Sequence, residues 1–280
     1  MARPLRIEYP GALYHVMSRG NACQDIFLVD EDRFLYLENL KHCAELHNLI
    51  IHAYCLMGNH YHLLIETPDG NLSKAMRDIN GNYAQKFNFQ HDSVGHLLQG
   101  RYKAFLIEKE VYFLEVARYI VNNPVSAGVV DDPAKWQWSS YGATAGQIDA
   151  PEWLEVDFTL GLFGADRTSM QKHYRTFVRE ARLGRSPYEE VEEGVILGTK
   201  PFIDAIWAKF QEAEDFQEVN KSDRMIGRPS LDEIFEDAHG KEDRDQMIRM
   251  ARARAGYSVS EIARHLKIHR TTVSRIINES

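Results

Sequence analysis

The order of strand-like and helix-like segments in the first 123 residues constrains the fold more than any other feature of the chain. Four short segments have the apolar content of strands, and they are 11–18, 49–57, 60–66 and 101–108. Three segments have the spacing of amphipathic helices, and they are 31–48, 72–83 and 110–123. The order strand, helix, two strands, helix, strand, helix predicts a ferredoxin-like α+β domain, with an antiparallel sheet and helices on one face.

The third predicted strand begins with HYHLLIE and carries two histidines, His60 and His62. Side chains at i and i+2 point to the same face of a strand, so both imidazoles are expected side by side while Tyr61 faces the core. Neutral imidazoles are good ligands for divalent cations. A half-exposed strand also tolerates histidines that bind nothing, so the pair alone leaves both interpretations open.

The last predicted helix, 110–123, adds two candidate groups. Tyr119 and Asn123 are four residues apart, so they lie on one helical face. The carbonyl oxygen of Asn123 suits a hard cation, and the phenol of Tyr119 can act as a nucleophile. Alternatively, Tyr119 is one of 13 tyrosines on an amphipathic helix, and Asn123 is the helix C-cap before Pro124.

Four polar residues near these motifs are candidates for contacts with nucleic acid. Arg101 and Lys103 alternate along the fourth predicted strand, where they either hold phosphates or form a solvated strand face. Arg19 and Asn21 lie in the turn SRGN, where they either contact DNA or simply belong to the turn. The sequence leaves both pairs of alternatives open.

The formal charge of −8 is unevenly distributed along the chain. Basic and acidic residues number 13 and 17 in residues 1–149, 11 and 19 in residues 150–239, and 9 and 5 in residues 240–280. Only the C-terminal end is basic, so DNA contacts elsewhere depend on local placement of charge. We expect three parts: an α+β unit at 1–150, a helical acidic connecting region at 151–228 and a C-terminal unit at 229–280.

The C-terminal segment SVSEIARHLKIHRTTVSRIIN, residues 258–278, has the pattern of a helix-turn-helix. Lys267 stands at the turn position that usually holds glycine, so a lysine must take or avoid a left-handed conformation there. The second helix would present to a DNA major groove Arg270, Thr271, Thr272, Ser274 and Arg275. A helical bundle for protein contact is the alternative, and the local excess of basic residues favours DNA.

The sequence does not predict export or a membrane span. The N-terminus MARPLRIEYPG has two arginines without an apolar segment behind them, and no stretch approaches the ~18 consecutive apolar residues of a span. Cys23, Cys43 and Cys55 form an odd set without a CxxC pair, which fits a reducing compartment. We therefore expect a cytoplasmic protein without a membrane partner.

Five motifs stand in the order found in the single-tyrosine HUH transposases, and they are SRGN, HAYCLMGNHYHLLI, GRYKAFLI, ARYIVNNPVSAGVV and WQWSSYGA. Over residues 5–146 the sequence most resembles the REP-associated tyrosine transposases of bacteria. The linked set is far more specific than any single motif. Two features depart from the family. Tyr61 is larger and more polar than the aliphatic residue often found between the histidines, and Tyr112 is a rival to Tyr119 as the nucleophile.

This resemblance implies that His60, His62 and Asn123 hold a divalent metal ion, Mg²⁺ or Mn²⁺. It implies that Tyr119 attacks DNA and leaves a 5′-phosphotyrosine link and a free 3′-OH. The implied substrate is single-stranded or hairpin DNA, with repetitive palindromic elements as the expected partner of a monomer or homodimer. Two other functions stay open: a DNA-binding regulator whose HUH domain is inactive, and a metal-dependent hydrolase in which Tyr119 is structural.

Overall fold

The computed structural model describes residues 7–181, 187–190, 195–214, 231–235, 240–253 and 259–278. The chain divides into two compact units, Met1–Ile203 and Asp204–Ser280. Within the described residues, no helix has both the length and the apolar content needed to cross a membrane.

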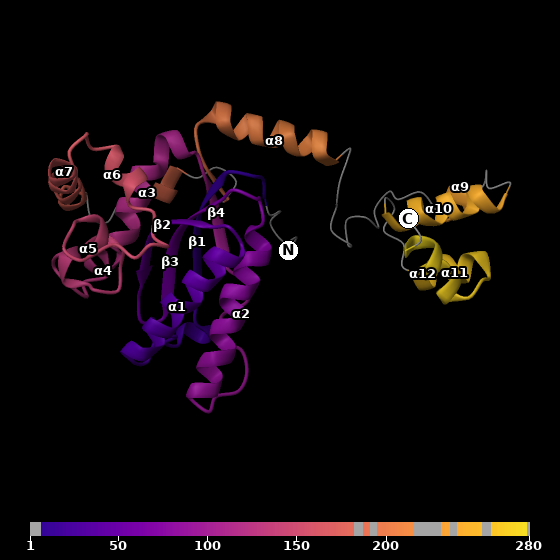
Figure 1. Ribbon diagram of the computed structural model, residues 1–280, viewed down its shortest axis with the longest axis horizontal. Coiled ribbons are helices and arrows are strands. Elements are labelled where there is room, and N and C mark those ends of the chain that lie inside the picture. Colours follow the sequence, from indigo (N-terminus) through magenta and orange to yellow (C-terminus); the bar gives the residue numbers. More distant parts are fainter. Residues whose placement is uncertain are drawn as a thin grey trace. The chain divides into compact units, whose positions relative to one another are not determined.

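The first unit is built on a five-stranded sheet with the strand order β2-β3-β1-β4-β5 (Figure 1). The strands are β1 (Ala12–Arg19), β2 (Ile50–Leu56), β3 (His60–Thr67), β4 (Lys103–Ile107) and β5 (Ile196–Leu197). β1 pairs antiparallel with β3 and β4, and β2 pairs antiparallel with β3. The predicted α+β class and the ferredoxin-like order of the first four strands are confirmed.

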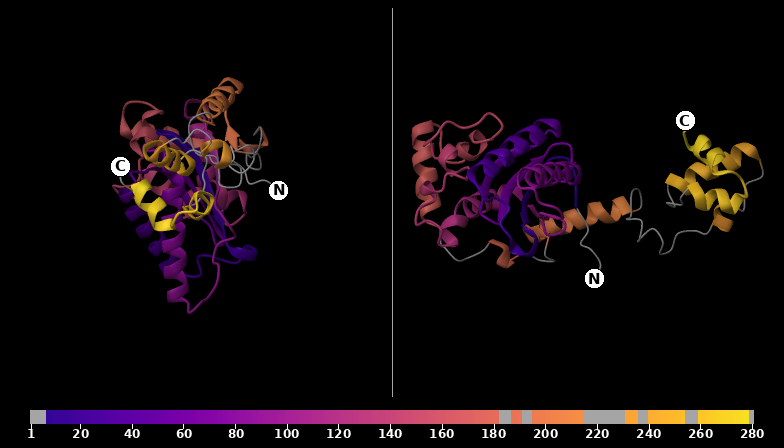
Figure 2. Two further views of the ribbon diagram at one scale, coloured as in Figure 1. Left: turned by 90° about the vertical axis from the view of Figure 1, so that its right-hand side faces the viewer. Right: turned by 90° about the horizontal axis from the view of Figure 1, so that it is seen from below.

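Two details of the predicted sheet are wrong. β5 pairs parallel with β4, so the sheet is mixed and not purely antiparallel. The helices also lie on both faces, because α1 (Asp30–Leu46) and α2 (Leu72–Gln90) pack side by side on one face, whereas α3 (Lys109–Val121) packs on the other (Figures 1 and 2). The periodicity of a helix identifies its apolar side but not the face of the sheet that receives it.

Tyrosine rings fill the core between the sheet and the first two helices. Tyr61 of β3, Tyr36 of α1 and Tyr83 of α2 are fully buried, and the centroid of the Tyr36 ring lies 4.8 Å from that of Tyr61 and 5.1 Å from that of Tyr83. The Tyr61 hydroxyl donates to Oδ1 of Asn80 on α2, as a buried phenol requires. The prediction that Tyr61 faces the core is confirmed. Residues that alternate with Tyr61, including both candidate histidines, therefore face α3.

On the opposite face, α3 buries an apolar stripe against β1, β2 and β3. Its buried side chains are Phe113, Val116, Ala117 and Ile120. Glu66 of β3 fixes the start of this helix, because its Oε2 accepts hydrogen bonds from Lys109 Nζ at 2.6 Å and from His52 Nε2 at 3.0 Å. Glu66 and His60 lie at opposite ends of β3. The start of α3 contacts Glu66, and Tyr119 near its end contacts His62, so these two contacts together fix the direction of α3 along the strand.

The predicted helix at 110–123 is broken before its last residue. α3 ends at Val121, Asn122 is its C-cap, and Asn123 begins the short helix α4 (Asn123–Ser126), in whose first turn Pro124 lies. Proline is tolerated in the first turn of a helix because the N–H groups there have no partner in the same helix. Asn123 therefore starts a new helix but still lies one turn beyond Tyr119.

Helices and short turns follow α4 in the first unit. They are η2 (Pro133–Lys135), α5 (Tyr141–Thr144), α6 (Asp157–Gly161), α7 (Arg167–Arg179) and η3 (Pro187–Glu190). α7 packs on the far end of α3, where the side-chain amide of Asn122 donates to the Val178 carbonyl at 3.1 Å. α8 (Lys200–Glu214) spans the boundary between the two units.

The second unit consists of helices around a small apolar core. The helices are α9 (Leu231–Phe235), α10 (Lys241–Ala253), α11 (Val259–Leu266) and α12 (Arg270–Asn278). Ile248, Ile262 and Val273 are fully buried where α10, α11 and α12 meet. Between α11 and α12, Lys267 takes a φ of +53°, the left-handed conformation that a tight helix-helix turn demands. The predicted helix-turn-helix is therefore present.

Replacing Glu66 by Gln is expected to lower the free energy of unfolding by about 1–2 kcal/mol at pH 7, because Lys109 loses its charged partner. Hydrogen bonds from His52 and then from Lys109 lower the pKa of Glu66 to about 2. A carboxyl with a depressed pKa adds stability above its unfolded-state pKa, and this stability is lost as the pH falls toward about 2. Urea unfolding curves should therefore differ at pH 7 and converge in acid.

The control is Glu45→Gln, which changes an exposed carboxylate on α1. This variant should unfold like the wild type at both pH values. A Glu66→Gln difference that persists undiminished at pH 2 would contradict an ionic role for Glu66.

Candidate functional site

The predicted histidine pair and the predicted tyrosine meet between β3 and the last turns of α3. His60 and His62 have ring centroids 5.0 Å apart. The Tyr119 ring stands edge-on to His62, with 6.1 Å between centroids. Tyr112 packs against the core under α3 and makes no ring contact with a histidine within the described residues. Among the two tyrosines, it is Tyr119 that faces the histidines.

Asn59 sets which ring nitrogen of His60 carries the proton. The Nδ2 group of Asn59 donates to the Cys23 carbonyl at 3.1 Å, which turns its Oδ1 toward His60. Nδ1 of His60 lies 2.6 Å from this Oδ1, and a carbonyl oxygen can only accept a hydrogen bond. The proton of neutral His60 is therefore on Nδ1, and Nε2 keeps a lone pair.

His62 has one engaged nitrogen and one buried nitrogen without a partner. Its Nδ1 lies 2.9 Å from Nε2 of His15 on β1. Its Nε2 has no hydrogen-bond partner within the part of the chain that the structure describes, although the residue is only 3% exposed. A buried polar atom left unpaired costs about 1–3 kcal/mol. A ligand on this atom would remove that cost, so the site fits a cation.

Burial keeps the imidazoles of this cluster neutral. It lowers the pKa of His15 to about 3 and the pKa of His62 well below its ordinary value, and for His62 the neighbouring His15 and His60 lower it further. Burial and the charge of Arg19 also lower the pKa of His60. Only a neutral imidazole can donate a lone pair to a cation. The cluster is therefore in its ligating form at neutral pH.

The third predicted ligand, Asn123, folds back on the last turn of α3. Its Nδ2 donates to the carbonyls of Tyr119 at 3.0 Å and Ile120 at 3.4 Å, which directs its Oδ1 away from those carbonyls. No cluster of three or more His, Cys, Asp or Glu side chains that could hold a metal ion occurs among the described residues. A cation at the histidine pair would therefore need further oxygen ligands from an amide, water or substrate.

The predicted set of site residues omits two groups that the structure places in the cluster, His15 and Tyr188. Tyr188 of η3 stacks on His15 with 5.2 Å between ring centroids and stands edge-on to Tyr119 at 5.6 Å. Its hydroxyl is hydrogen-bonded to Nδ1 of His15. Burial, and then the nearby Tyr119, raise the pKa of Tyr188 well above its ordinary value. In the sequence, His15 stands out only as a histidine within the predicted strand 11–18, and Tyr188 belongs to no motif, so neither residue could be assigned to the site from the sequence.

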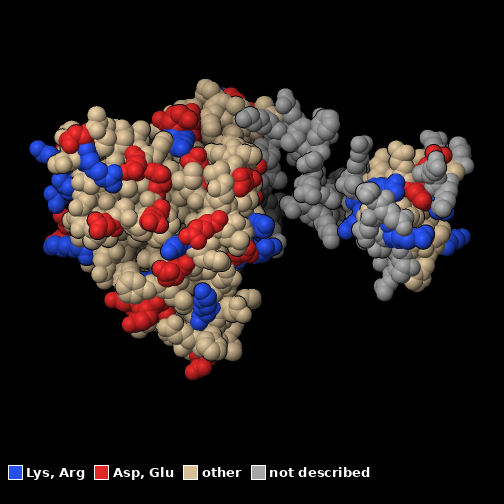
Figure 3. All heavy atoms as spheres, in the orientation of Figure 1, with Lys and Arg blue, Asp and Glu red and all other residues tan. Residues whose placement is uncertain are grey.

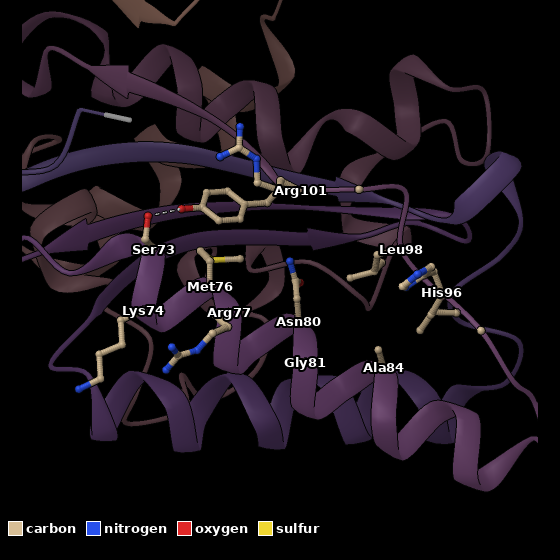
Figure 4. Close-up of a pocket in the computed structure, with 14 residues that line it drawn as sticks. Ser73, Lys74, Met76, Arg77, Asn80, Gly81, Ala84, His96, Leu98 and Arg101 are labelled. Carbon is tan, nitrogen blue, oxygen red and sulfur yellow. Dashed lines mark hydrogen bonds between the residues drawn. The ribbon is translucent and has the colours of Figure 1, made fainter. Parts of the chain in front are cut away.

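A groove of about 660 Å³ lies between α2 and the chain that leads into β4 (Figure 4). Lys74, Arg77 and Arg101 line it, and no carboxylate lines it among the described residues. Its apolar lining comes from Met76, Ala84, Leu97 and Leu98. A groove with cationic and apolar lining suits a flexible anion with flat rings, such as an unpaired nucleotide strand.

This groove and the histidine site lie near the same end of β1 but on opposite faces of the sheet, because α2 lines the groove and the histidines face α3. Arg19 pairs with His60 in the β1–β3 ladder, and Gly20 forms a bridge with Leu98 of the groove. The backbones of Leu98 and His60 are therefore two strand spacings apart, roughly 10 Å.

The remaining candidate residues of the first unit are solvent-exposed. Arg19 ends β1, Asn21 begins η1 (Asn21–Cys23), and Lys103 begins β4. Arg101 precedes β4 and lines the groove. These four exposed side chains lie at or next to the ends of β1 and β4 that are near the histidines and the groove.

In the second unit, α12 is the helix that follows the left-handed turn. Arg275 is exposed on it and Thr272 is partly buried, whereas the side chains of Arg270, Thr271 and Ser274 lie outside the described residues. Figure 3 shows several Lys and Arg side chains on the visible face of this unit. The local charge is consistent with a surface for DNA phosphates.

Each of the two units contains a segment that matches a known protein family. Residues 9–123 match the family model described as transposase IS200 like, and residues 241–280 match the model described as homeodomain-like domain. Residues 9–123 are therefore similar to IS200-like transposases, and residues 241–280 are similar to homeodomain-like domains.

Two solved structures are similar to parts of the chain. The structure of a REP-associated tyrosine transposase bound to a REP hairpin shares 18% identity, over 54% of this chain and 89% of that chain, with a TM-score of 0.46. A putative transposase from Deinococcus radiodurans R1 shares 21% identity, over 43% of this chain and 97% of that chain, with a TM-score of 0.32. No curated protein matched the chain.

Replacing Arg275 by Ala is expected to weaken DNA binding by the full-length protein uniformly across sequences. Removal of one cation that neutralises a phosphate should reduce the slope of log K against log salt by about 1. Fluorescence anisotropy with labelled duplex DNA at several salt concentrations measures this slope. An unchanged slope in Arg275→Ala would argue for a protein-contact role of this face.

Proposed function

We propose that this protein is a transposase that cleaves and rejoins single-stranded or hairpin DNA through a covalent link to Tyr119. Residues 1–150 would form the catalytic domain, 229–280 the DNA-binding domain and 151–228 the connection between them. The observation that carries the proposal is the contact of Tyr119 with His62, whose buried Nε2 has no partner among the described residues. A nucleophile next to an unused buried ligand atom is the arrangement that metal-assisted phosphodiester chemistry requires.

In this proposal His60 and His62 hold Mg²⁺ or Mn²⁺ through their Nε2 atoms, and Asn123 adds its Oδ1. The Nδ1 atoms are engaged with Asn59 and His15, so the Nε2 atoms are those left for a cation. Such an ion, when bound, acts as a Lewis acid toward the scissile phosphate and stabilises the developing charge.

The chain's own part in the reaction is to supply and orient the phenol. Tyr119 is held by rings on three sides, at 6.0 Å from His15, 6.1 Å from His62 and 5.6 Å from Tyr188 between centroids. Its oxygen forms a bond to phosphorus and loses its proton to water, while the bond to the 3′ oxygen breaks and that oxygen takes up a proton. The 5′-phosphotyrosine keeps the energy of the diester, so the reverse step rejoins strands without ATP.

Unpaired DNA fits this site better than duplex. The groove beside α2 combines three cationic side chains with an apolar lining, which can hold backbone and splayed bases of one strand. Arg19, Asn21 and Lys103 would contact phosphates between the groove and the histidines. Arg270, Thr271, Thr272 and Arg275 would contact a separate duplex segment through the helix-turn-helix.

Replacing Tyr119 by Phe removes one oxygen and keeps the ring, so folding should be preserved. Both the covalent adduct and DNA cleavage are expected to vanish, because no other group supplies the attacking oxygen. Denaturing gels of end-labelled hairpin DNA incubated with each variant and Mg²⁺ measure both products.

The matched control is Tyr112→Phe. Tyr112 lies on the same helix and packs against the apolar core, so this variant should retain both the adduct and cleavage. An adduct that survives in Tyr119→Phe and is lost in Tyr112→Phe would move the nucleophile to Tyr112. An adduct lost in neither variant would exclude both tyrosines, and an absence of adduct in the wild type would favour a regulator or a hydrolase.

The double variant Lys74→Ala and Arg101→Ala tests the groove. It should weaken binding of single-stranded DNA about tenfold and reduce the salt slope by about 0.7 for each phosphate that is no longer neutralised. The control is the double variant Lys41→Ala and Lys86→Ala, which removes the same charge at exposed positions outside the groove and should bind like the wild type. Equal effects of the two double variants on single-stranded DNA would show that only net charge matters.

A further inference from the structure

We propose that His15 is a positioning residue that fixes the tautomer of His62, and that Tyr188 stabilises the Nδ1–H tautomer of His15 by accepting a hydrogen bond from it. This inference rests on the proposed function in one respect, namely that His62 holds a cation through Nε2. It assigns a task to a histidine of β1 and to a tyrosine that lies beyond residues 9–123, the part that matches the transposase family model.

The three side chains form one continuous line of hydrogen bonds. Nδ1 of His62 lies 2.9 Å from Nε2 of His15, and Nδ1 of His15 is hydrogen-bonded to the Tyr188 hydroxyl. The rings are stacked along this line, with centroids 5.1 Å apart for His62 and His15 and 5.2 Å apart for His15 and Tyr188. His15 is fully buried and His62 is 3% exposed, so water is excluded from the histidine pair.

The position of one proton in this line determines whether His62 can bind a cation. Each neutral imidazole carries one N–H and one lone pair. If His62 donates from Nδ1 to His15, its Nε2 has the lone pair that a cation requires. If His15 donates from Nε2 instead, His62 must carry its proton on Nε2, where it blocks a ligand and leaves a buried N–H without an acceptor among the described residues.

The Tyr188 hydroxyl can accept from or donate to Nδ1 of His15, so it is the buried Nε2 of His62 that favours the first arrangement, because an N–H there would have no acceptor among the described residues. When His15 accepts at Nε2, its own proton is on Nδ1 and needs an acceptor there. The Tyr188 oxygen provides it at the position the structure shows. Metal-binding histidines in proteins almost always donate their second ring nitrogen in this way, and removing the partner typically costs 10- to 100-fold in metal affinity.

The two histidines of β3 have different supporting partners because they lie at different depths. His60 is half-buried at the rim, and the neighbouring Asn59 on the β2–β3 turn orients it. His62 is deeper, and its partner comes from β1 and, through that, from η3. The segment at 187–190 thus extends the site from the sheet of the family domain into the C-terminal half of the chain.

The first measurement is the tautomer itself. Long-range ¹H–¹⁵N correlation spectra of the full-length, metal-free protein labelled at histidine distinguish Nδ1–H from Nε2–H imidazoles. We expect Nδ1–H for both His62 and His15, with the His62 signal assigned by its absence from a His62→Asn variant. An Nε2–H tautomer at His62 would overturn the proposal. Tyr188→Phe, which removes only the oxygen, should shift His15 toward Nε2–H, and an unchanged spectrum would overturn the part assigned to Tyr188.

The second measurement is the affinity for Mn²⁺ alone, followed by electron paramagnetic resonance of the free ion, with binding to a His60→Ala, His62→Ala double variant subtracted. His15→Phe keeps an aromatic ring but has no acceptor, so the affinity should fall about 10- to 100-fold. His15→Gln lacks the ring but can place its Oε1 near the position of Nε2, so it should stay within about threefold of the wild type. A role in packing alone predicts the opposite order, and that order would overturn the proposal.

Neither measurement uses DNA, so failure of the proposed function has a different signature. If Tyr119→Phe still forms an adduct while His62 shows the Nδ1–H tautomer, the nucleophile is wrong and the positioning of His62 stands. If the wild type does not bind Mn²⁺ at the histidines, the cation site is wrong, and the spectra still decide whether His15 and Tyr188 set the tautomer. If His15→Phe does not fold, the Mn²⁺ affinity of Tyr188→Phe tests the same chain of hydrogen bonds, because Tyr188 is its last member.

Discussion

The alternation of side chains along β3 is the constraint on which the rest of this structure depends. Tyr61 is fully buried between the sheet and the first two helices, where its hydroxyl is bonded to Asn80. Because its neighbours in the strand must point the other way, His60 and His62 face α3. If the pairing of β3 shifted by one residue, His60 and His62 would point into the tyrosine core and the site would be lost. The burial of Tyr61 therefore fixes the register of β3 and, with it, the position of the two histidines.

Burial of the histidine cluster has a cost that other contacts partly offset. Placing polar rings out of water is unfavourable unless each nitrogen finds a partner, and the structure provides partners for Nδ1 of both histidines of β3 through Asn59 and His15. In the cluster of His15, His60 and His62, Nε2 of His62 is the buried nitrogen left without a partner among the described residues. This unpaired atom lies beside the Tyr119 ring, and that combination is what marks the site in the structure.

The helix α3 links the site to the stability of the fold. Its first residue is tied to Glu66 at one end of β3, and its ring Tyr119 reaches the histidines at the other end. α3 ends at Val121 with Asn122 as its C-cap, and α4 begins at Asn123. The position of the Tyr119 phenol is therefore set by the whole length of a packed helix, which places a side chain more precisely than a loop would.

The sequence by itself determined the first four strands and their order, the two helices between them and the third after them, the facing of Tyr61, and the helix-turn-helix, because these depend on local periodicity and turn chemistry. The structure decided that Lys267 takes the left-handed conformation in the turn. It also indicated His60, His62 and Tyr119 as a group, through the order of motifs. Tertiary structure alone decided which face α3 covers, the parallel pairing of β5, and the meeting of His15 with Tyr188. Those features depend on contacts between segments far apart in the chain, namely the burial of aromatic rings and the pairing of strand edges. Such long-range contacts produce no periodic pattern in the sequence.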